Sequence, residues 1–357
     1  MKKTIYFWVI FAFAACNVKQ SVKENVVLFV QYDTIQIPIT SEFLPYYTNI
    51  AGYHDSVDIL YAYNPHLHHI DVFDITHGRC IKNIRLDKEG SNGILNVGKF
   101  NVCDNSIYTY TTPFYFDINF SGEINSKLDE NKIEDFPYND FSLKRAGVII
   151  TNFNELFINC TYKTVPVPVY SNSSFAGIGY IALDSGTFEM FSIPLPSFKG
   201  NYGNLETPFI NWMGDTIIYN FPFSSSIYVY YINEKTHKEI KVNSIYTKNN
   251  ANELANSKIS WAAEAEHQVV SLQFLSVKYD PFRDLYYRIH LAPIDNMKFM
   301  NNRELYLTVM DNKFNYLKEF KLPQGIFSPI YIITREGIVF QMRSEEDTMY
   351  LLRVNIN

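Results

Sequence analysis

The segment His69–Leu86, HIDVFDITHGRCIKNIRL, contains two strand-like runs on either side of a tight turn. In the first run apolar and polar residues alternate as far as Ile75, and the turn carries Gly78. Alternation with a period of two is typical of a half-buried strand, and a short glycine-containing turn between two such runs predicts a β-hairpin.

The same hairpin pattern recurs along the chain, and an apolar strand precedes each copy. The further copies are Phe114–Phe120 with Glu123–Leu128, Gly179–Asp184 with Thr187–Leu195, Ile227–Asn233 with His237–Val242, and Leu305–Asp311 with Phe314–Leu322. The preceding strands are marked by Tyr63, Tyr108, Phe157, Tyr219, Tyr286 and Phe340, which are on average about 55 residues apart. Four-stranded propeller blades repeat at about 40–50 residues, so this spacing fits a propeller with insertions.

Six such units use nearly all of the 357 residues, which predicts an all-β, six-bladed β-propeller, with seven blades as the alternative. The chain ends support this prediction. After Phe340 there is room for the strand Met349–Ile356 but not for an outer strand, whereas Tyr32–Ile39 alternates and has no hairpin partner. We expect these two segments to pair and to close the last blade, with Pro38 tolerated on its edge.

Two segments depart from the strand pattern. Ala251–His267 is rich in Ala and Glu, which predicts a short helix or an ordered loop. Tyr162–Ser174 contains Pro166 and Pro168, and we interpret it as an extended loop between strands.

The N-terminus predicts export. Two lysines precede the apolar run Ile5–Ala15, which is too short to cross a bilayer and is typical of a signal peptide. Ala14 and Ala15 lead to Cys16 in a pattern that resembles a bacterial lipobox, although Phe13 replaces the usual aliphatic residue. The alternative is an ordinary signal peptide with a chance cysteine.

The predicted organisation is a signal peptide at 1–15, a lipidated Cys16 with a tether at 16–25, and one propeller domain at 26–357. Cleavage would remove two lysines and change the net charge from −6 to −8. Anchorage to the outer membrane is expected. The side facing the periplasm is favoured because Asn17–Gln20 lacks the acidic cluster that surface-exported lipoproteins tend to carry.

Composition excludes some classes of protein. With 47% hydrophobic residues the chain is not disordered, and without a basic run it lacks the footprint of a nucleic-acid binder. Three cysteines remain after Cys16, namely Cys80, Cys103 and Cys160. We favour buried free thiols over a single disulfide for them.

Several features resemble a known family. The lipobox-like start, the strand Tyr279–Arg288 (YDPFRDLYYR), the turn Phe221–Ser224 ahead of Ile227–Tyr230, and the length are similar to an uncharacterised lipoprotein family of Bacteroidetes. That family is known only as a domain of unknown function and is similar to six-bladed β-propellers. The resemblance spans about residues 16–357 and implies no catalytic residues.

The segment Tyr279–Arg288 also contains the candidate ligand-binding residues. Arg283, Tyr287 and Arg288 would lie on an inner strand near the channel, where arginine and tyrosine can bind a carboxylate, a sulfate or a sugar. The structural alternative, which we favour, is that Asp280 caps the turn and the arginines pair with carboxylates between blades.

A metal site at His66 and His68 is possible in principle if they share one face of a strand, but no further ligand stands at suitable spacing. A polar hairpin loop is the favoured interpretation. No nucleophile elbow, phosphate loop or zinc-protease motif occurs. We therefore assign no catalytic residue, metal or cofactor.

Two functions remain open. The first, which we favour, is a monomeric, lipid-anchored propeller that binds a protein, peptide or glycan without catalysis. The second is a periplasmic hydrolase or lyase with its active site in the central channel. An acidic pair facing a histidine across the channel would favour the enzyme.

Overall fold

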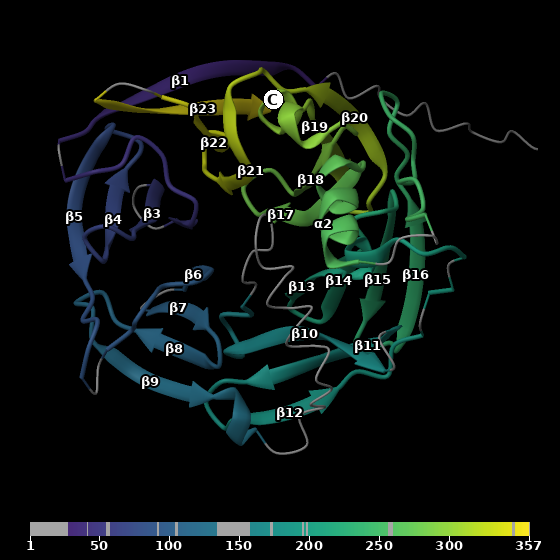
Figure 1. Ribbon diagram of the computed structural model, residues 1–357, viewed down its shortest axis with the longest axis horizontal. Helices are drawn as coiled ribbons and strands as arrows, with labels where there is room; N and C mark the ends of the chain where they lie inside the picture. The colour runs from purple at the N-terminus through teal and green to yellow at the C-terminus, as the bar shows by residue number, and fades with distance from the viewer. Residues whose placement is uncertain are drawn as a thin grey trace, which may run out of the picture.

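A computed structural model describes residues 28–356 except 41, 55–57, 91–92, 104–105, 134–157, 172–173, 195, 198, 256–259 and 345–346. These residues form six sheets arranged around a central axis, as Figure 1 shows. The protein is therefore a six-bladed β-propeller, and the prediction of six rather than seven blades is confirmed. The signal segment, Cys16 and the tether lie outside the described residues.

The sheets follow one another in chain order and define the blades. Blade 1 contains β2 (Ile50–His54), β3 (Asp58–Asn64), β4 (His69–Asp74) and β5 (Arg79–Arg85). Blade 2 contains β6 (Phe100–Cys103), β7 (Ser106–Thr111), β8 (Phe114–Ile118) and β9 (Ile124–Asp129). Blade 3 contains β10 (Thr164–Ser171), β11 (Ser174–Ala182) and β12 (Thr187–Met190).

Blades 4 and 5 repeat the four-stranded pattern. Blade 4 contains β13 (Phe209–Met213), β14 (Thr216–Asn220), β15 (Ser226–Tyr231) and β16 (Thr236–Lys241). Blade 5 contains β17 (Gln273–Asp280), β18 (Leu285–Leu291), β19 (Leu305–Asp311) and β20 (Tyr316–Lys321). All five predicted hairpins are thus present. Five of the marker residues lie on the second strand of their blade, and the sixth, Phe157, lies outside the described residues.

Blade 6 closes the ring with both ends of the chain. It contains β21 (Ile326–Ile333), β22 (Ile338–Met342), β23 (Thr348–Ile356) and, outermost, β1 (Val30–Pro38). β1 pairs antiparallel with β23 from Val30 opposite Ile356 to Pro38 opposite Thr348. The predicted closing strand is confirmed, and Pro38 lies on the edge of the sheet, where a missing N–H costs no ladder hydrogen bond.

Burial explains the sequence pattern. The strands in the middle of blade 1, β3 and β4, are buried along their whole length, while its outer strand β5 is mostly exposed. The core is divided into apolar clusters that lie between neighbouring blades, one of which joins Ile37 of β1 to Phe73 of blade 1. Each blade therefore buries its apolar faces against the next blade, and these interfaces provide room for large rings in a chain that contains 27 Tyr and 28 Phe.

One loop prediction is wrong. Thr164–Ser171 is the strand β10 and not an extended loop, with Pro166 opposite Tyr180 and Pro168 opposite Ile178. Because N–H groups two residues apart point to the same side of a strand, both prolines can face away from β11, and the ladder is kept.

Helical segments lie in the links between strands. They are η1 (Glu130–Lys132), η2 (Gly203–Glu206), α2 (Trp261–Val270) and η3 (Met297–Asn302). The predicted short helix is present as α2 but starts later than expected, after Ser260, whose Oγ accepts a hydrogen bond from the N–H of Ala263 (3.2 Å). In the part of the chain described, no helix has the length and apolarity required to span a membrane.

Candidate functional site

A cavity of about 300 Å³ lies where the inner strands of the blades converge. Its wall is formed by residues of β2, β6, β13, β17 and β21 and by residues outside these strands, namely Asn49, Lys99, Ile158 and Pro281. This size is at the lower end of the range for small-molecule sites, so the cavity suits a ligand of about the size of a monosaccharide.

The polar side chains of the cavity are lysine and amide groups. They are Lys99, Lys278, Asn49, Asn101 and Asn211, with Tyr279 near the end of β17. Among the described residues that line the cavity there is no Asp, Glu or His. The two lysines are therefore the charged side chains among the described lining residues, and they favour an anionic ligand over a cationic one.

Contacts within the ring orient these groups. Lys278 Nζ donates to the carbonyl oxygen of Tyr331 (2.8 Å) and lies 4.3 Å from the centre of the Tyr331 ring. Asn211 Nδ2 donates to the carbonyl oxygen of Val277 across the interface of blades 4 and 5 (3.3 Å). A side chain held in this way loses little conformational freedom when a ligand binds.

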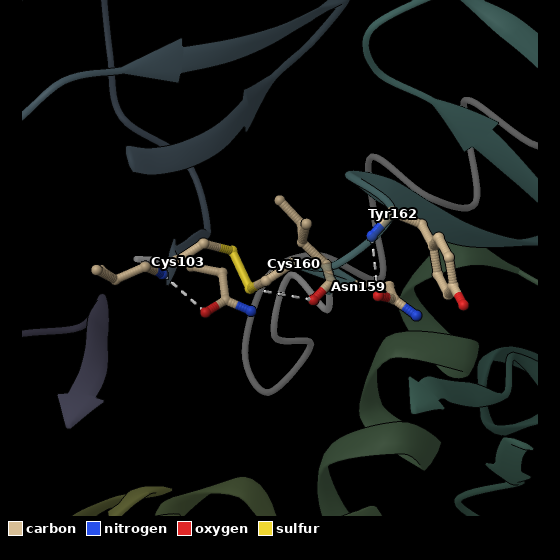
Figure 2. The surroundings of a disulfide bond; sticks show 7 residues. Cys103, Asn159, Cys160 and Tyr162 are labelled. Atoms are coloured by element: carbon tan, nitrogen blue, oxygen red, sulfur yellow. Dashed lines mark hydrogen bonds between the residues drawn. A yellow bond between two sulfur atoms is a disulfide. The ribbon is translucent and has the colours of Figure 1, made fainter. Parts of the chain in front are cut away.

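A disulfide holds one part of the cavity wall. Cys103, at the end of β6, is bonded to Cys160, and their Cα atoms are 5.6 Å apart (Figure 2). The residues around Cys160 include Ile158, which lines the cavity, and Tyr162, whose N–H donates to Asn159 Oδ1 (3.3 Å). Blade 2 is thereby tied to the segment that leads into blade 3.

The prediction of three free thiols is wrong. The bonded cysteines are 57 residues apart in sequence, and only the adjacency of blades 2 and 3 brings them together. Cys80 remains a free, half-buried thiol. Burial, followed by the charge of Asp71, raises its pKa, so it lacks the acidity of a reactive thiolate.

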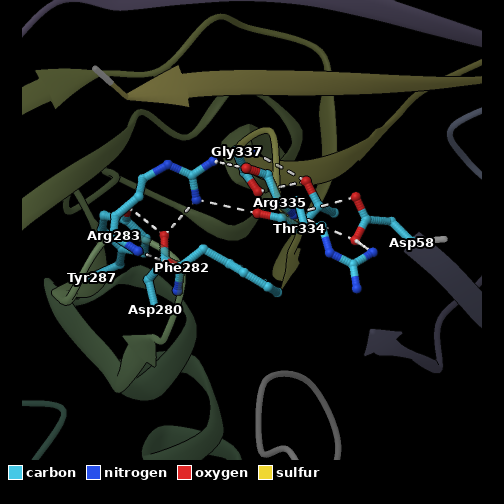
Figure 3. Close-up of polar contacts among 8 residues, drawn as sticks. All are labelled: Asp58, Asp280, Phe282, Arg283, Tyr287, Thr334, Arg335 and Gly337. Carbon is cyan, nitrogen blue, oxygen red and sulfur yellow. Dashed lines mark hydrogen bonds and ion pairs between the residues drawn. The ribbon is translucent and has the colours of Figure 1, made fainter. Parts of the chain in front are cut away.

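Arg283 lies in the turn between β17 and β18 and joins blade 5 to blade 6 (Figure 3). Its Nη1 donates to Asp280 Oδ2 (2.7 Å) and to the carbonyl oxygen of Thr334 (3.1 Å), and its Nη2 donates to the carbonyl oxygen of Arg335 (2.7 Å). Asp280 Oδ1 also accepts from the N–H of Phe282 (2.9 Å) and so caps the turn, as the structural alternative proposed.

Tyr287 belongs to the same network and has no exposed surface. Its hydroxyl donates to Asp280 Oδ2 (2.8 Å), and burial, followed by the charge of Asp280, raises its pKa well above the usual range. The network continues through Arg335, whose N–H donates to Asp58 Oδ2 of blade 1 (3.2 Å). Blades 5, 6 and 1 are thus joined by polar contacts as well as by apolar packing.

Arg288 is also fully buried, on the second strand β18 and not on the inner strand that the sequence suggested. Its guanidinium donates to the carbonyl oxygens of Ser225 and Val242 (2.8 Å each) and lies 4.7 Å from the Phe274 ring. Burial lowers its pKa to about 9, although the charge of Glu319 acts in the opposite direction and raises it. The structure places none of Arg283, Tyr287 and Arg288 in the wall of the cavity.

His66 and His68 lie in the turn between β3 and β4, and not on one face of a strand. His68 is buried, and its Nδ1 lies 2.8 Å from the hydroxyl of Tyr63. Within the described ranges no group of three or more His, Cys, Asp and Glu side chains is arranged to hold a metal ion.

A serine, a histidine and a glutamate meet between blades 4 and 5. Ser244 Oγ is 3.3 Å from His290 Nε2, and His290 Nδ1 is 3.5 Å from Glu319 Oε1. The serine hydroxyl makes other hydrogen bonds. Its Oγ donates to Glu319 Oε2 (3.1 Å) and accepts from the N–H of Tyr246 (3.1 Å). Burial, and then the charge of Arg288, lower the pKa of His290 to about 3, which makes it too weak a base to activate a hydroxyl.

Sequence reasoning missed the cavity residues Lys99 and Lys278. They are far apart along the chain and match no motif, because the lining is assembled from short segments of several blades. The one available signal was that Lys278 directly precedes Tyr279, the start of the segment already singled out.

Comparison with known proteins agrees with the fold described above. A solved structure of a member of the DUF4221 family from Bacteroides vulgatus has a TM-score of 0.69 at 16% identity, and the match covers 92% of this chain and 98% of that chain. A Bacteroides fragilis protein inferred to be exported has a TM-score of 0.55 at 12% identity, with 94% and 97% covered. At such identities these likenesses show the fold alone.

The search of curated proteins finds no match. The family model described as "Domain of unknown function (DUF4221)" matches residues 18–321, which is most of the chain. The chain therefore belongs to the DUF4221 family, a family of six-bladed β-propeller architecture whose function is unknown.

Proposed function

We propose that this protein is a lipid-anchored binding protein of the cell envelope that holds a small anionic ligand in the central channel of its propeller. The observation that carries the proposal is the cavity of about 300 Å³, which is lined by two lysines and three asparagines and by no acidic side chain among its described residues. Lysine and amide groups together bind carboxylates and hydroxyl groups.

The composition of the cavity supports binding over hydrolysis. The enzymatic alternative called for an acidic pair facing a histidine across the channel. The described residues of the lining include neither. Ser244 and the buried His290 and Glu319 lie elsewhere, and the serine hydroxyl already makes other hydrogen bonds.

Three observations support the envelope location. The N-terminus has the pattern of a signal peptide ending at Cys16. The Cys103–Cys160 disulfide suits an oxidising compartment. The Bacteroides fragilis protein that shares the fold is inferred to be exported. We further propose that the lipid on Cys16 anchors the chain in the outer membrane, facing the periplasm.

Anchorage is tested with Cys16→Ser in the organism's own envelope. We expect wild-type protein in the membrane fraction, carrying a fatty-acid analogue, and the variant in the soluble fraction without label. A variant that stays in the membrane, with no label on the wild type, would show that the anchor is not a lipid.

Ligand binding is tested by calorimetry with glucuronate and with glucose, which has the same ring but no carboxylate. We expect glucuronate to bind more tightly, and Lys278→Met and Lys99→Met to weaken its binding about tenfold or more, as the loss of a charge-assisted hydrogen bond implies. The control is Lys238→Met, on the exposed outer strand β16. Equal affinity for both sugars, or no effect of either channel lysine, would refute the anionic site.

A further inference from the structure

The two faces of the propeller differ in the links that they carry. On one face, short turns join the first strand of a blade to the second and the third strand to the fourth, as at 281–284 between β17 and β18 and at 312–315 between β19 and β20. On the opposite face lie the longer links that contain η2, α2 and η3. We call these the tight-turn face and the loop face.

The N-terminal strand enters the propeller from the tight-turn face. Because the turn between β21 and β22 lies on that face, β23 starts at the loop face and ends with Ile356 at the tight-turn face. Val30 of β1 is opposite Ile356 in an antiparallel pair, so β1 begins at the tight-turn face. In agreement, Lys318 Nζ, near the start of β20, donates to the carbonyl oxygen of Leu28 (3.4 Å).

The stretch between Cys16 and this entry point is short. Leu28 follows Cys16 by 12 positions. A chain of that length reaches about 40 Å when fully extended and about 20 Å on average as a random coil. The seven residues of β18 alone separate the two faces by about 23 Å. A lipid on Cys16 would therefore hold the tight-turn face nearer to the bilayer than the loop face.

Exposed aromatic rings and lysines surround the entry point. Phe29, which directly follows Leu28, is 68% exposed, and Tyr316 is 38% exposed. Tyr316 and Lys318 are two positions apart on β20, so they point to the same side of the strand, where Lys318 contacts Leu28. Lys313 is exposed in the turn just before β20.

The neighbouring turn of blade 5 continues this surface. The side chain of Asn312 donates to Asp284, so the two turns of the blade are in contact. Phe282, in the same turn as Asp284, is 39% exposed, and the Arg335 guanidinium of blade 6 lies 5.8 Å from the centre of its ring. We call the following residues the tether-side patch: Phe29, Phe282, Lys313, Tyr316 and Lys318.

These residue types suit the headgroup region of a bilayer. Aromatic rings are stabilised at the boundary between headgroups and acyl chains, and a lysine can lay its aliphatic stem on apolar surface while its ammonium group contacts phosphate. The loop face also exposes apolar side chains, among them Trp261, which is 68% exposed. It lies, however, on the opposite side of the propeller from the point where β1 enters.

We infer that the tether-side patch rests on the bilayer that holds the lipid of Cys16, so that the loop face points away from the membrane. This inference rests on the proposed lipid anchor. It commits to one occupant for the patch, the headgroup layer of a phospholipid bilayer. It also has a consequence for the cavity, since Pro281, which is exposed and lines the cavity, lies in the same turn as Phe282. The cavity therefore reaches the face that lies next to the membrane.

The test anchors the protein chemically and measures which face meets the lipid. The processed chain from Cys16, carrying Cys80→Ser, is coupled through the Cys16 thiol to a maleimide lipid in vesicles of phosphatidylethanolamine and phosphatidylglycerol. Cys103 and Cys160 are bonded to each other and do not react. Because the coupling replaces lipidation in the cell, the surface is tested separately from the natural anchor.

Two variants with a single tryptophan report on the two faces. The processed chain contains Trp212 and Trp261, so Trp212→Phe leaves the loop-face reporter Trp261. Trp212→Phe combined with Trp261→Phe and Tyr316→Trp moves the reporter to the patch. We expect brominated lipid to quench the reporter at position 316 and to leave the emission of Trp261 unchanged. Trp261 is the more exposed site, so random collisions with lipid would give the opposite order.

The contribution of the patch is measured with Phe29→Ser. Loss of a buried aromatic ring should lower the ratio of docked to undocked molecules about tenfold and so remove most of the quenching at position 316. The matched control is Leu67→Ser, in the turn between β3 and β4 on the loop face, because Leu67 is 52% exposed. It should leave the quenching unchanged.

The remaining outcomes overturn one proposal or the other. Quenching of Trp261 alone, equal quenching of both reporters, or quenching of neither would refute the inferred orientation. Quenching at position 316 that survives Phe29→Ser would refute contact through the patch. If the coupled protein behaves as expected but Cys16 carries no lipid in the cell, the natural anchor is refuted and the affinity of the patch for a bilayer stands.

Discussion

At the residue scale, Arg288 shows how the propeller uses a buried charge. Its guanidinium donates hydrogen bonds to the carbonyl oxygens of Ser225 and Val242 and so joins blade 5 to blade 4. We expect Arg288→Leu to lower the free energy of unfolding by about 3 kcal/mol, because it leaves buried carbonyls unpaired and the charge of Glu319 uncompensated. Denaturant unfolding measures the loss.

The control for that measurement is Arg79→Leu. The Arg79 side chain is 66% exposed and lies 3.7 Å from Asp74, so its loss should cost less than about 1 kcal/mol. Equal effects of the two substitutions would show that burial of Arg288 contributes nothing.

His290 predicts a pH dependence of stability. Its pKa is lowered to about 3 by burial and then by the charge of Arg288, and its neighbours also include Ser244 and Glu319. The unfolded chain binds the proton near pH 6.5, so stability falls as the pH falls from about 6.5 towards 3, by up to about 1.4 kcal/mol per pH unit. His290→Phe, which keeps a ring between Phe274 and Tyr306, should flatten this slope.

The measurement is the free energy of unfolding at a series of pH values between 7 and 4. His66→Phe, in an exposed turn, controls for the removal of an imidazole. An unchanged slope in His290→Phe would rule out His290 as the titrating group.

At the scale of the element, β1 is the strand whose loss would open the ring. It pairs along its whole length with β23 and contributes Ile37, which is fully buried, to the cluster between blades 6 and 1. Deleting residues 26–40 should lower the melting temperature by about 10 °C or more and leave β23 as an exposed edge that promotes association. Calorimetry and light scattering would detect both effects.

The matched control is a chain that begins at residue 26 and so keeps β1. It should melt as the full-length protein does. A deletion variant that is equally stable and monomeric would contradict the closing role of β1.

At the scale of the whole molecule, the disulfide adds a covalent link between the end of β6 in blade 2 and the segment that leads into blade 3. A bond across 57 residues restricts the unfolded chain, and the chain-entropy relation gives about 4 kcal/mol for a loop of that size. Cys103→Ser with Cys160→Ser should therefore lower the free energy of unfolding by about 2–4 kcal/mol.

Reductant provides the check. Wild-type protein should lose stability in reductant, and the double variant should not respond to it. Cys80→Ser, which leaves the disulfide intact, should behave as the wild type. A wild type indifferent to reductant would show that the bond contributes no stability.

The sequence alone predicted the architecture, because the features that specify it are local strand patterns and the number and spacing of their copies. The period-two alternation in His69–Leu86 and its copies determined the hairpins, and the spacing of Tyr63, Tyr108 and their equivalents determined six blades. The unpaired strand at one end and the missing strand at the other predicted the closure by β1, since every blade must complete its sheet.

Only the tertiary structure decided what lies between the blades. The pairing of Cys103 with Cys160, the burial of Arg288 and the convergence of Lys99 with Lys278 each join residues from different blades. Strand patterns indicate which face of a strand is apolar. They do not indicate which residues of two neighbouring blades lie at the same level along the propeller axis. That relation depends on how the sheets twist and pack around the axis, so the cavity and the set of residues that line it become visible only in three dimensions.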